Sequence, residues 1–280
     1  MTAVGDLTGL VRVRLELSYQ GTDFAGWARQ PGQRTVQGAV EQALATVLRA
    51  PAELTVAGRT DAGVHATGQV AHCDLPSELW QEYAPTLRRR LAGVLPPDVR
   101  VRHITAAEDG FDARFSALSR EYAYRIAATE WGVEPLRRFD TLHWPGRLDL
   151  AAMQQAVPAL LGEHDFAAFC RPREGATTIR TLHRLEWTPD DDVLVAAVEA
   201  DAFCRAMVRS LVGAVLSVGA GRQDPSWPAE VLAGKVRDPR VAVAPAHGLT
   251  LVGVRYPRPD ELAVQARRTR RRRAPRTIAG

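Results

Sequence analysis

Cysteine is scarce in this chain, and its spacing argues against structural bonds or metal binding. Cys73, Cys170 and Cys204 are the only three cysteines among 280 residues, and none belongs to a CxxC pair. An odd and scattered set favours buried small hydrophobic residues over a disulfide framework. The seven histidines are also scattered, and no third ligand follows His65 and His72 closely in sequence. We therefore expect neither a disulfide bond nor a zinc site.

Long apolar segments are missing as well. No window approaches 18 consecutive uncharged apolar residues, so no transmembrane helix is expected. The first residues lack the basic and then apolar pattern of a secretory signal. With 46% hydrophobic and 24% charged residues, the composition is that of an ordinary soluble globular protein. The chain is expected in the cytoplasm, and its length suits one large domain or two of moderate size.

Lysine is nearly absent, and arginine carries almost all of the positive charge. The formal net charge is +4, but seven arginines and no acidic residue follow Glu261, so the chain up to that residue carries −3. The overall balance therefore does not by itself indicate nucleic-acid binding, and a binding surface must come from local clusters. Short clusters of this kind are more often solvated surface than binding sites. The candidates are Arg88, Arg89, Arg90, Arg137, Arg138, Arg171 and Arg173.

The spacing of apolar residues in the first part of the chain predicts the order strand, helix, strand, strand, helix, strand. Residues 11–19 alternate apolar and polar side chains, which is typical of a half-buried strand. Apolar residues at helical spacing predict helices over residues 36–48 and 87–95, and both end before prolines. Strands are expected on both sides of a Gly-rich loop around Asp61 and again over residues 99–104.

The second part of the chain repeats this order loosely. Asp190, Asp191 and Asp192 are expected to form a turn between two strands. The predicted strands cover residues 122–126, 179–187, 193–198 and 249–256, and the predicted helices cover residues 150–161, 206–218 and 228–235.

These patterns predict an α+β fold with two similar βαββαβ-like halves, a mainly antiparallel sheet and a central active-site cleft. The expected halves are residues 1–107, which carry the Asp61 loop, and residues 108–262. Residues 263–280 are expected to form a disordered Arg-rich tail, because such a segment buries nothing and its charges repel one another. The tail could add salt-dependent affinity for RNA or have no role.

The segment of residues 57–72 has the pattern of a strand, a Gly-rich loop and a second strand, with one carboxylate, Asp61, on the loop. Gly58, Gly63 and Gly68 allow positive φ and let a ligand approach the backbone closely. The same residues also suit an ordinary turn, because aspartate accepts hydrogen bonds from nearby amides. Taken alone, the segment leaves both interpretations open.

The eight residues Gly58-Arg59-Thr60-Asp61-Ala62-Gly63-Val64-His65 resemble the catalytic loop of the bacterial tRNA pseudouridine synthases of the A type. The resemblance extends over residues 11–257. It includes Met207-Val208-Arg209 at the start of an apolar helix, a tyrosine segment around Tyr122, and the segments 23–27 and 111–115, which we interpret as scaffold and RNA-contact loops. The chain differs from the family pattern at residues 204–206, where the family often has histidines, and in its Arg-rich tail.

The resemblance assigns roles to four residues. Asp61 is implied as the nucleophile, which either attacks C1′ or abstracts a sugar proton, and Arg209 as its ion-pair partner. Arg209 is the only charge in the apolar run of residues 206–218. Without the resemblance, we would interpret it as an arginine at the helix edge whose guanidinium extends into water. Tyr122 is implied to stack on the uracil and to help transfer the C5 proton, whereas Tyr124 is expected to pack in the core. Arg59 is implied as a substrate-binding residue that helps replace the extruded nucleotide or contacts its phosphate.

The implied function is isomerisation of uridine to pseudouridine at positions 38, 39 and 40 of the tRNA anticodon stem-loop. The resemblance also implies a homodimer and a reaction that needs no metal or organic cofactor. One alternative is a catalytically inactive RNA-binding protein built from paired α+β modules. Another is a metal-dependent phosphodiesterase, which is disfavoured because consecutive aspartates seldom converge on one ion. Its ligands would be Asp190, Asp191, Asp192, Glu199 and Asp201.

Overall fold

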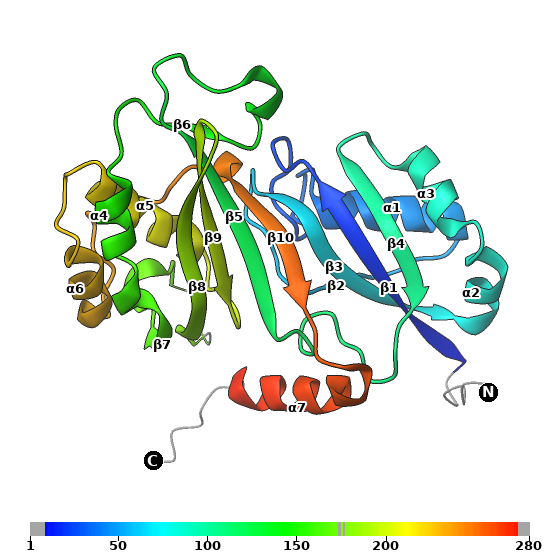
Figure 1. The fold of residues 1–280 in the computed structure, drawn as a ribbon. Coiled ribbons are helices and arrows are strands. Elements are labelled where there is room, and N and C mark those ends of the chain that lie inside the picture. Colours follow the sequence, from blue (N-terminus) through cyan, green and yellow to red (C-terminus); the bar gives the residue numbers. More distant parts are fainter. Residues whose placement is uncertain (1–8, 173–174, 176, 274–280) are drawn as a thin grey trace.

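The computed structural model describes residues 9–172, 175 and 177–273 (Figure 1). The elements of the first part are β1 (Leu10–Tyr19), α1 (Val36–Leu48), β2 (Thr55–Val56), β3 (His65–Pro76), α2 (Ser77–Tyr83), α3 (Leu87–Val94) and β4 (Val99–Ala106). Those of the second part are β5 (Ser119–Ala127), β6 (Leu142–His143), α4 (Leu150–Gln155), β7 (Gly162–Asp165), β8 (Ile179–Asp190), β9 (Val193–Ala200), α5 (Met207–Gly219), α6 (Trp227–Gly234), β10 (Leu249–Arg255) and α7 (Leu262–Arg273). Short 3-10 turns include η1 (Pro135–Arg137), η2 (Pro158–Leu160), η3 (Ala167–Phe169), η4 (Ala246–Gly248) and η5 (Pro259–Glu261).

Ten strands of the described residues form one sheet. Its order is β4-β1-β3-β10-β5-β9-β8-β7, with β2 beside β3 and β6 beside β5. All pairs are antiparallel except β3 with β10 and β5 with β6. The predicted α+β class with a mainly antiparallel sheet is therefore confirmed.

The helices pack on the sheet at its two flanks, α1 and α3 at one end and α4, α5 and α6 at the other (Figure 1). In β1 the alternation places Val13, Leu15 and Leu17 in the core, as the sequence predicts for a half-buried strand. Helix α1 begins at a proper N-cap, because the Thr35 hydroxyl accepts a hydrogen bond from the Gly38 amide at 3.2 Å. No helix of the described residues is long and apolar enough to cross a membrane.

A short seam joins the strands of the first part to those of the second. Strands β3 and β10 pair in parallel over two positions only, His65 with Thr250 and Ala66 with Leu251. Just beyond, a Cβ atom on Gly68 would lie 2.1 Å from the Val252 carbonyl oxygen, so only glycine permits this approach of the two backbones. The seam begins directly after the Asp61 loop, and its position therefore fixes where that loop leaves the sheet.

Two buried histidines hold other loops to β3. The Nδ1 atom of His65 accepts a hydrogen bond from the Gly21 amide at 2.9 Å, and Nδ1 of His72 accepts one from the Ala113 amide at 3.0 Å. Because Nδ1 accepts a hydrogen bond, it carries no proton, and each ring is neutral with its proton on Nε2. Protonating Nδ1 would break the contact. Burial lowers the pKa of both histidines, and in His72 the nearby charge of Arg12 lowers the pKa further.

Most predicted elements are present, with one break. The predicted helix over residues 150–161 is wrong in its second half, where α4 ends at Gln155 and η2 follows from Pro158. Proline cannot donate to the preceding turn, and the chain tightens into a 3-10 turn instead. The predicted turn of Asp190, Asp191 and Asp192 is confirmed, since it connects the hairpin strands β8 and β9.

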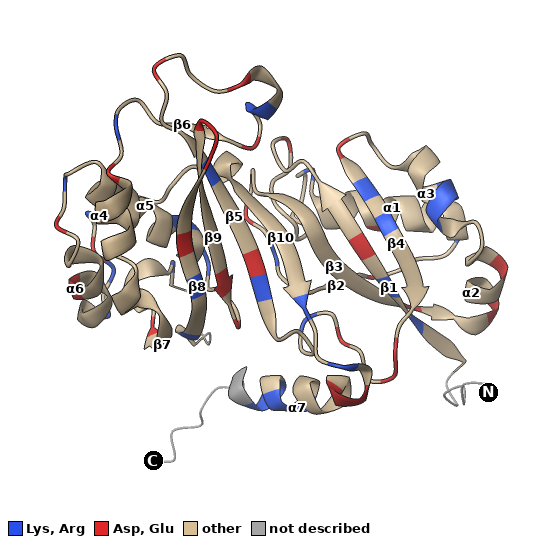
Figure 2. Cartoon of the chain, viewed as in Figure 1, with Lys and Arg blue, Asp and Glu red and all other residues tan. Residues whose placement is uncertain are grey.

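The prediction of a disordered tail over residues 263–280 is wrong for the part that the structure describes. Residues Leu262–Arg273 form α7, and residues 274–280 lie outside the described residues. The helix buries Leu262, Ala266 and Thr269, which share one face at spacings of four and three residues. This contact surface was not apparent from the arginine-rich composition, which is visible on α7 in Figure 2.

The expectation of three unpaired cysteines is wrong for two of them. Cys170 and Cys204 are joined in a disulfide, and their Cα atoms are 5.7 Å apart. The pair links the end of η3 to the loop before α5, whereas Cys73 is free and buried as expected. The 34-residue separation of Cys170 and Cys204 gave no local signal of this contact.

We predict that Gly68→Ala destabilises the protein by about 1–3 kcal/mol, because the added methyl group forces the β3 and β10 backbones apart. The matched control is Gly93→Ala in α3, where an added Cβ meets nothing within 4 Å and helix propensity improves. Urea unfolding measures both variants. An unchanged midpoint for Gly68→Ala would show that the seam is not under this constraint.

We also predict that the free energy of unfolding falls as pH decreases below about 6.5, the ordinary histidine pKa of the unfolded chain. In that range His65 and His72 bind protons in the unfolded state but stay neutral in the folded state, because burial lowers their pKa values there. The loss is at most about 1.4 kcal/mol per pH unit for each histidine. In His72→Asn, whose Oδ1 atom takes the place of Nδ1 as the acceptor for the Ala113 amide, urea unfolding between pH 7.5 and 5.5 should show a weaker pH dependence than in the unsubstituted protein. Equal slopes would refute the assignment to His72.

Candidate active site

The loop that carries Asp61 connects β2 to β3 and rests on the loop that follows β1. The Trp27 amide donates a hydrogen bond to the Thr60 carbonyl at 3.0 Å. A Cβ atom on Gly26 would lie 2.8 Å from the same carbonyl oxygen, so the two loops are in backbone contact. The segment of residues 23–27 therefore has the scaffold role that the sequence suggests, because it supports the backbone next to Asp61.

A buried polar network supports the Asp61 loop from the sheet side. The hydroxyl groups of Tyr19 and Thr60 are hydrogen-bonded at 2.8 Å. The Gln69 amide donates to the Tyr19 hydroxyl at 3.1 Å and to the Gly58 carbonyl at 2.8 Å. Burial raises the pKa of Tyr19 to about 12, so its hydroxyl keeps its proton at neutral pH. The sequence reading did not single out Tyr19 or Gln69, because both act through partners about 40 to 50 residues away.

The structure brings Asp61 and Arg209 together. An oxygen of the Asp61 carboxylate lies 3.7 Å from Nη1 of Arg209, which is an ion-pair distance but longer than a hydrogen bond. The Asp61 side chain is 37% exposed and that of Arg209 is 18% exposed. Within the described residues, the Asp61 carboxylate accepts no hydrogen bond. It is accessible, oriented by a cation, and has its lone pairs free.

Arg209 is fixed from both its side chain and its backbone. Its Nε donates to the Ala244 carbonyl at 2.6 Å, and the Ala244 amide donates to the Arg209 carbonyl at 3.0 Å. Helix α5 packs tightly on the same segment, since a Cβ atom on Gly213 would lie 1.9 Å from the Ala242 carbonyl oxygen. Burial lowers the pKa of Arg209 and the charge of Asp61 opposes this shift. The guanidinium is therefore a rigid positive charge aimed at Asp61.

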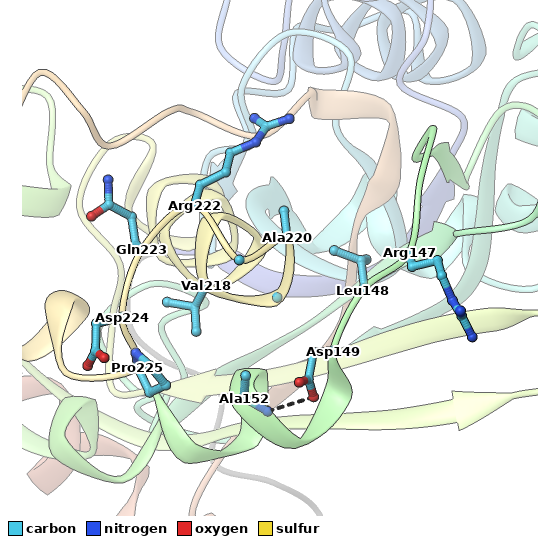
Figure 3. Close-up of a pocket in the computed structure, with 12 residues that line it drawn as sticks. Arg147, Leu148, Asp149, Ala152, Val218, Ala220, Arg222, Gln223, Asp224 and Pro225 are labelled. Carbon is cyan, nitrogen blue, oxygen red and sulfur yellow. Dashed lines mark hydrogen bonds between the residues drawn. The ribbon is translucent and has the colours of Figure 1, made fainter.

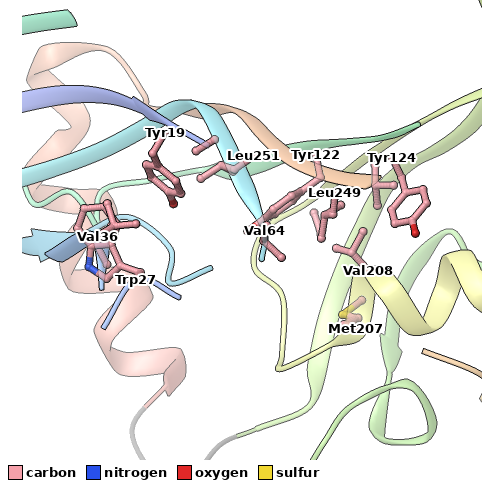
Figure 4. Packing of buried hydrophobic residues seen from close by; sticks show 14 of the residues in the cluster. Tyr19, Trp27, Val36, Val64, Tyr122, Tyr124, Met207, Val208, Leu249 and Leu251 are labelled. Atoms are coloured by element: carbon pink, nitrogen blue, oxygen red, sulfur yellow. The ribbon is translucent and has the colours of Figure 1, made fainter. Parts of the chain in front are cut away.

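Tyr122 lies on β5 in the hydrophobic cluster shown in Figure 4, which also contains Val64 and Leu249. Its ring packs edge-on against Phe203, with centroids 5.3 Å apart. Burial raises the pKa of the Tyr122 hydroxyl, and the negative charge of Asp61 raises it further. Tyr122 is therefore a neutral phenol at physiological pH.

Tyr124 lies in the core, as the sequence predicts. Its side chain is fully buried, and its hydroxyl donates to the Pro245 carbonyl at 2.8 Å. This bond reinforces the segment that also holds Arg209 through Ala244.

Arg120 is a functional candidate that the sequence reading missed. It is buried, and its guanidinium donates to the carbonyl oxygens of Ala57 (3.2 and 2.7 Å), Arg114 (2.7 Å) and Asp201 (2.8 Å). These carbonyls belong to the strand end before the Asp61 loop, to the loop before β5, and to the segment after β9. Burial lowers the pKa of Arg120, and its neighbours Tyr256, Tyr122 and Asp201 partly offset this shift. Its role was not recognisable from the sequence, because Ala57 and Asp201 are distant from it in the chain and Arg114 lies in an irregular loop.

Among the described residues, none of the remaining predicted basic residues forms a hydrogen bond or ion pair with Asp61. Arg59 is exposed, and within the described residues its side chain has no hydrogen bond or ion pair. Arg137 pairs with Asp140, and Arg173 lies outside the described residues. Arg59 thus remains free to meet a ligand, and its predicted RNA contact stays a prediction. Arg88, Arg89 and Arg90 are exposed on α3, Arg138 stacks on Phe139, and Arg171 is exposed.

A hollow of about 900 Å³ lies elsewhere, between the start of α4 and the end of α5 (Figure 3). It contains Asp149, whose carboxylate accepts a hydrogen bond from the Ala152 amide at 3.0 Å, and Arg222. None of the predicted site residues lines it. The described part of the chain also contains no group of three His, Cys, Asp or Glu side chains arranged to hold a metal ion.

The sequence was compared with family models and with curated and solved proteins. Residues 156–257 match a family model described as "tRNA pseudouridine synthase". A solved structure of the archaeal box H/ACA sRNP Nop10–Cbf5 complex aligns with a TM-score of 0.30 and 11% identity, over 73% of this chain and 43% of that one. A likeness this weak adds nothing to the assignment.

Full-length relatives are far more similar. The chain is 64% identical to tRNA pseudouridine synthase A of Frankia casuarinae over 97% of its own length and 99% of that protein. It is 58% identical to the protein of the same name from Streptomyces griseus, over 94% of each chain. For the Mycobacterium leprae protein of that name, identity is 50% over 96% of this chain and 98% of the relative. With such similarity over nearly its whole length, this chain belongs to the tRNA pseudouridine synthase A family.

Proposed function

We propose that this protein is a tRNA pseudouridine synthase that isomerises uridine in the anticodon region of tRNA. In this reaction the N1–C1′ bond breaks, the base turns, and a C5–C1′ bond forms, while C5 loses a proton and N1 gains one. The target nucleotide must leave its stack, because C1′ and C5 are hard to reach inside a helix. The observation that carries the proposal is the pairing of Asp61 with Arg209 at 3.7 Å on a loop that matches the family's catalytic motif.

Asp61 is the proposed nucleophile. Its carboxylate is partly exposed and accepts no hydrogen bond from the described residues, so an oxygen is available to a sugar carbon or proton. Arg209 supplies a nearby positive charge without occupying the carboxylate in a short hydrogen bond. The arrangement suits both attack at C1′ and abstraction of a sugar proton.

Tyr122 is proposed to stack on the uracil. A raised pKa means that its hydroxyl is protonated in the substrate-free site, which works against a phenolate base. A neutral hydroxyl can still donate a hydrogen bond to the base or pass a proton in a relay. The edge-on contact with Phe203 fixes the plane of the ring.

We further propose that the two parts of the sheet are a structural duplication with the site between them. The strand order β4-β1-β3-β2 of the first part corresponds to β10-β5-β9-β8 of the second, with the same antiparallel neighbours. This supports halves at residues 1–107 and 108–262 and a cleft that contains Asp61. Modification at positions 38, 39 and 40, the homodimer, the cytoplasmic location and an RNA contact of Arg59 belong to the same proposal.

Replacing Asp61 by Asn should reduce pseudouridine formation by at least about 1,000-fold, because an amide is not a nucleophile, while tRNA binding stays nearly unchanged. The matched control is Asp23→Asn, which removes the same charge from an exposed position on the supporting loop. The measurement is tritium release from tRNA labelled at C5 of uridine. Substantial release by the Asp61 variant would remove it from this role, and no release by the unsubstituted protein would favour a catalytically inactive RNA-binding protein.

Replacing Arg120 by Met should lower kcat about 10- to 100-fold, because the Asp61 loop loses a support that fixes its position. Carbonyls left without a partner also destabilise the fold, by about 1–3 kcal/mol each. The control is Leu185→Ala, a cavity in β8 with a comparable loss of stability. Both variants are assayed well below their unfolding temperatures. Equal kcat values would show that Arg120 acts only through stability.

A further inference from the structure

Helix α7 is attached to the body by one face. Leu262, Ala266 and Thr269 are buried on that face. The Ser116 hydroxyl donates to the Leu262 carbonyl at 3.2 Å, and a Cβ atom on Gly110 would lie 2.6 Å from the Cβ of Ala263. The helix therefore has a defined seat on the loop of residues 110–116.

A salt bridge and stacked side chains fix the middle of α7 on the same loop. Arg270 donates to the Asp112 carboxylate at 2.8 Å and lies over the Phe115 ring at 4.9 Å. Arg114 lies over the same ring at 5.0 Å. Asp112 is held in turn by the amides of Arg114 and Phe115. These contacts fix which face of α7 points outward.

The outward face of α7 carries uncompensated positive charge. Arg267, Arg268 and Arg271 are exposed, and within the described residues none of them has an ion-pair partner. Helix α7 contains no acidic residue, and Arg267 and Arg271 are four residues apart, a spacing at which like charges repel. Because the chain up to Glu261 carries −3, the net positive charge of the molecule comes from the seven arginines after that residue. Such a surface is complementary to a polyanion.

The seat of α7 is connected directly to the catalytic loop. Arg120 binds the Arg114 carbonyl in the seat and the Ala57 carbonyl just before Gly58 and Asp61. This guanidinium therefore bridges the loop under α7 and the backbone that leads to Asp61. Figure 1 shows α7 alongside the ends of β5 and β10, the strands next to the seam. An RNA bound at Asp61 that extends along β5 and β10 would meet the helix at the ends of these strands.

We propose that the outward face of α7 binds the sugar-phosphate backbone of the tRNA whose uridine occupies the Asp61 site, an inference that rests on the proposed function. Arg267, Arg268 and Arg271 contact phosphates, for which the guanidinium geometry is well suited. The contacts are independent of sequence, so they strengthen binding to every substrate tRNA equally. The buried face of α7 and the Arg270–Asp112 bridge hold the arginines in place.

The test compares R267Q/R268Q/R271Q with a control triple variant, R49Q/R147Q/R184Q, which loses the same charge from exposed positions remote from α7. Affinity for unmodified tRNA is measured between 50 and 300 mM salt, and circular dichroism monitors folding. The α7 variant should bind at least about tenfold more weakly at 100 mM salt, and the slope of log K against log salt should decrease by up to about 2. Its kcat at saturating tRNA should stay within about twofold, because none of the three residues touches the reacting atoms.

An α7 variant that matches the control in affinity and salt slope would overturn the inference. The inference would also be overturned if the α7 variant kept its tRNA binding but lost binding to vesicles of anionic phospholipid, because this result would assign the helix to a membrane surface. Self-association that is lost in the variant with unchanged tRNA affinity would assign it to a second copy of the chain and also overturn it. If the unsubstituted protein forms no pseudouridine but the α7 variant still loses tRNA affinity, the proposed reaction fails and the RNA-binding surface stands.

Discussion

The organisation of the site depends on one buried guanidinium. Arg120 has no carboxylate ion-pair partner within the described residues, and it donates instead to three backbone carbonyls from three separate segments. A buried charge is costly unless its hydrogen bonds are satisfied. If the three segments moved apart, the buried guanidinium would lose hydrogen bonds, and this cost holds the segments together. The arrangement makes the strand end before the Asp61 loop, the seat of α7 and the chain leading to α5 into one unit. Asp61 and Arg209, which come from opposite ends of the sequence, are thereby held in fixed relation.

The seam between β3 and β10 adds a second constraint at the other side of the Asp61 loop. Two parallel residue pairs and the close approach at Gly68 fix the point where the loop enters β3. The Tyr19, Thr60 and Gln69 network then holds the loop against the sheet. The proposed nucleophile requires such rigidity, because a displacement of about 1 Å can cost about 100-fold in rate. Within the described residues the Asp61 carboxylate accepts no hydrogen bond, so rigidity is provided by the backbone and not by groups that would compete with the substrate.

The periodicity of apolar residues predicted most of the helices and strands, and the resemblance to a known family predicted the candidate site residues. The alternation in β1 and the helical spacing in α1 were sufficient for those elements, and the Asp61 loop lies between two strands as predicted. Arg120 could not be found this way, because a buried arginine and a surface arginine look alike at the start of a strand. The Cys170–Cys204 bond and the seat of α7 also depend on long-range contacts. In α7, Arg267 and Arg268 lie between two of the three buried residues and further arginines follow, so the charge pattern outweighed the apolar spacing in the prediction.

Two groups of arginines in the molecule differ in physical behaviour. Arg209 lies 3.7 Å from Asp61 in a partly buried position, where salt screens little, and the buried Arg120 holds the backbone before the Asp61 loop through the Ala57 carbonyl. Arg267, Arg268 and Arg271 are exposed, so ions compete with any phosphate that they contact. This separation lets affinity for RNA be adjusted by exposed arginines without altering the charge environment of the carboxylate. Under the proposed function, it also explains how a chain whose body is net negative can act on a polyanion, because the arginines that the proposal uses are few and fixed in position, next to Asp61 and on α7.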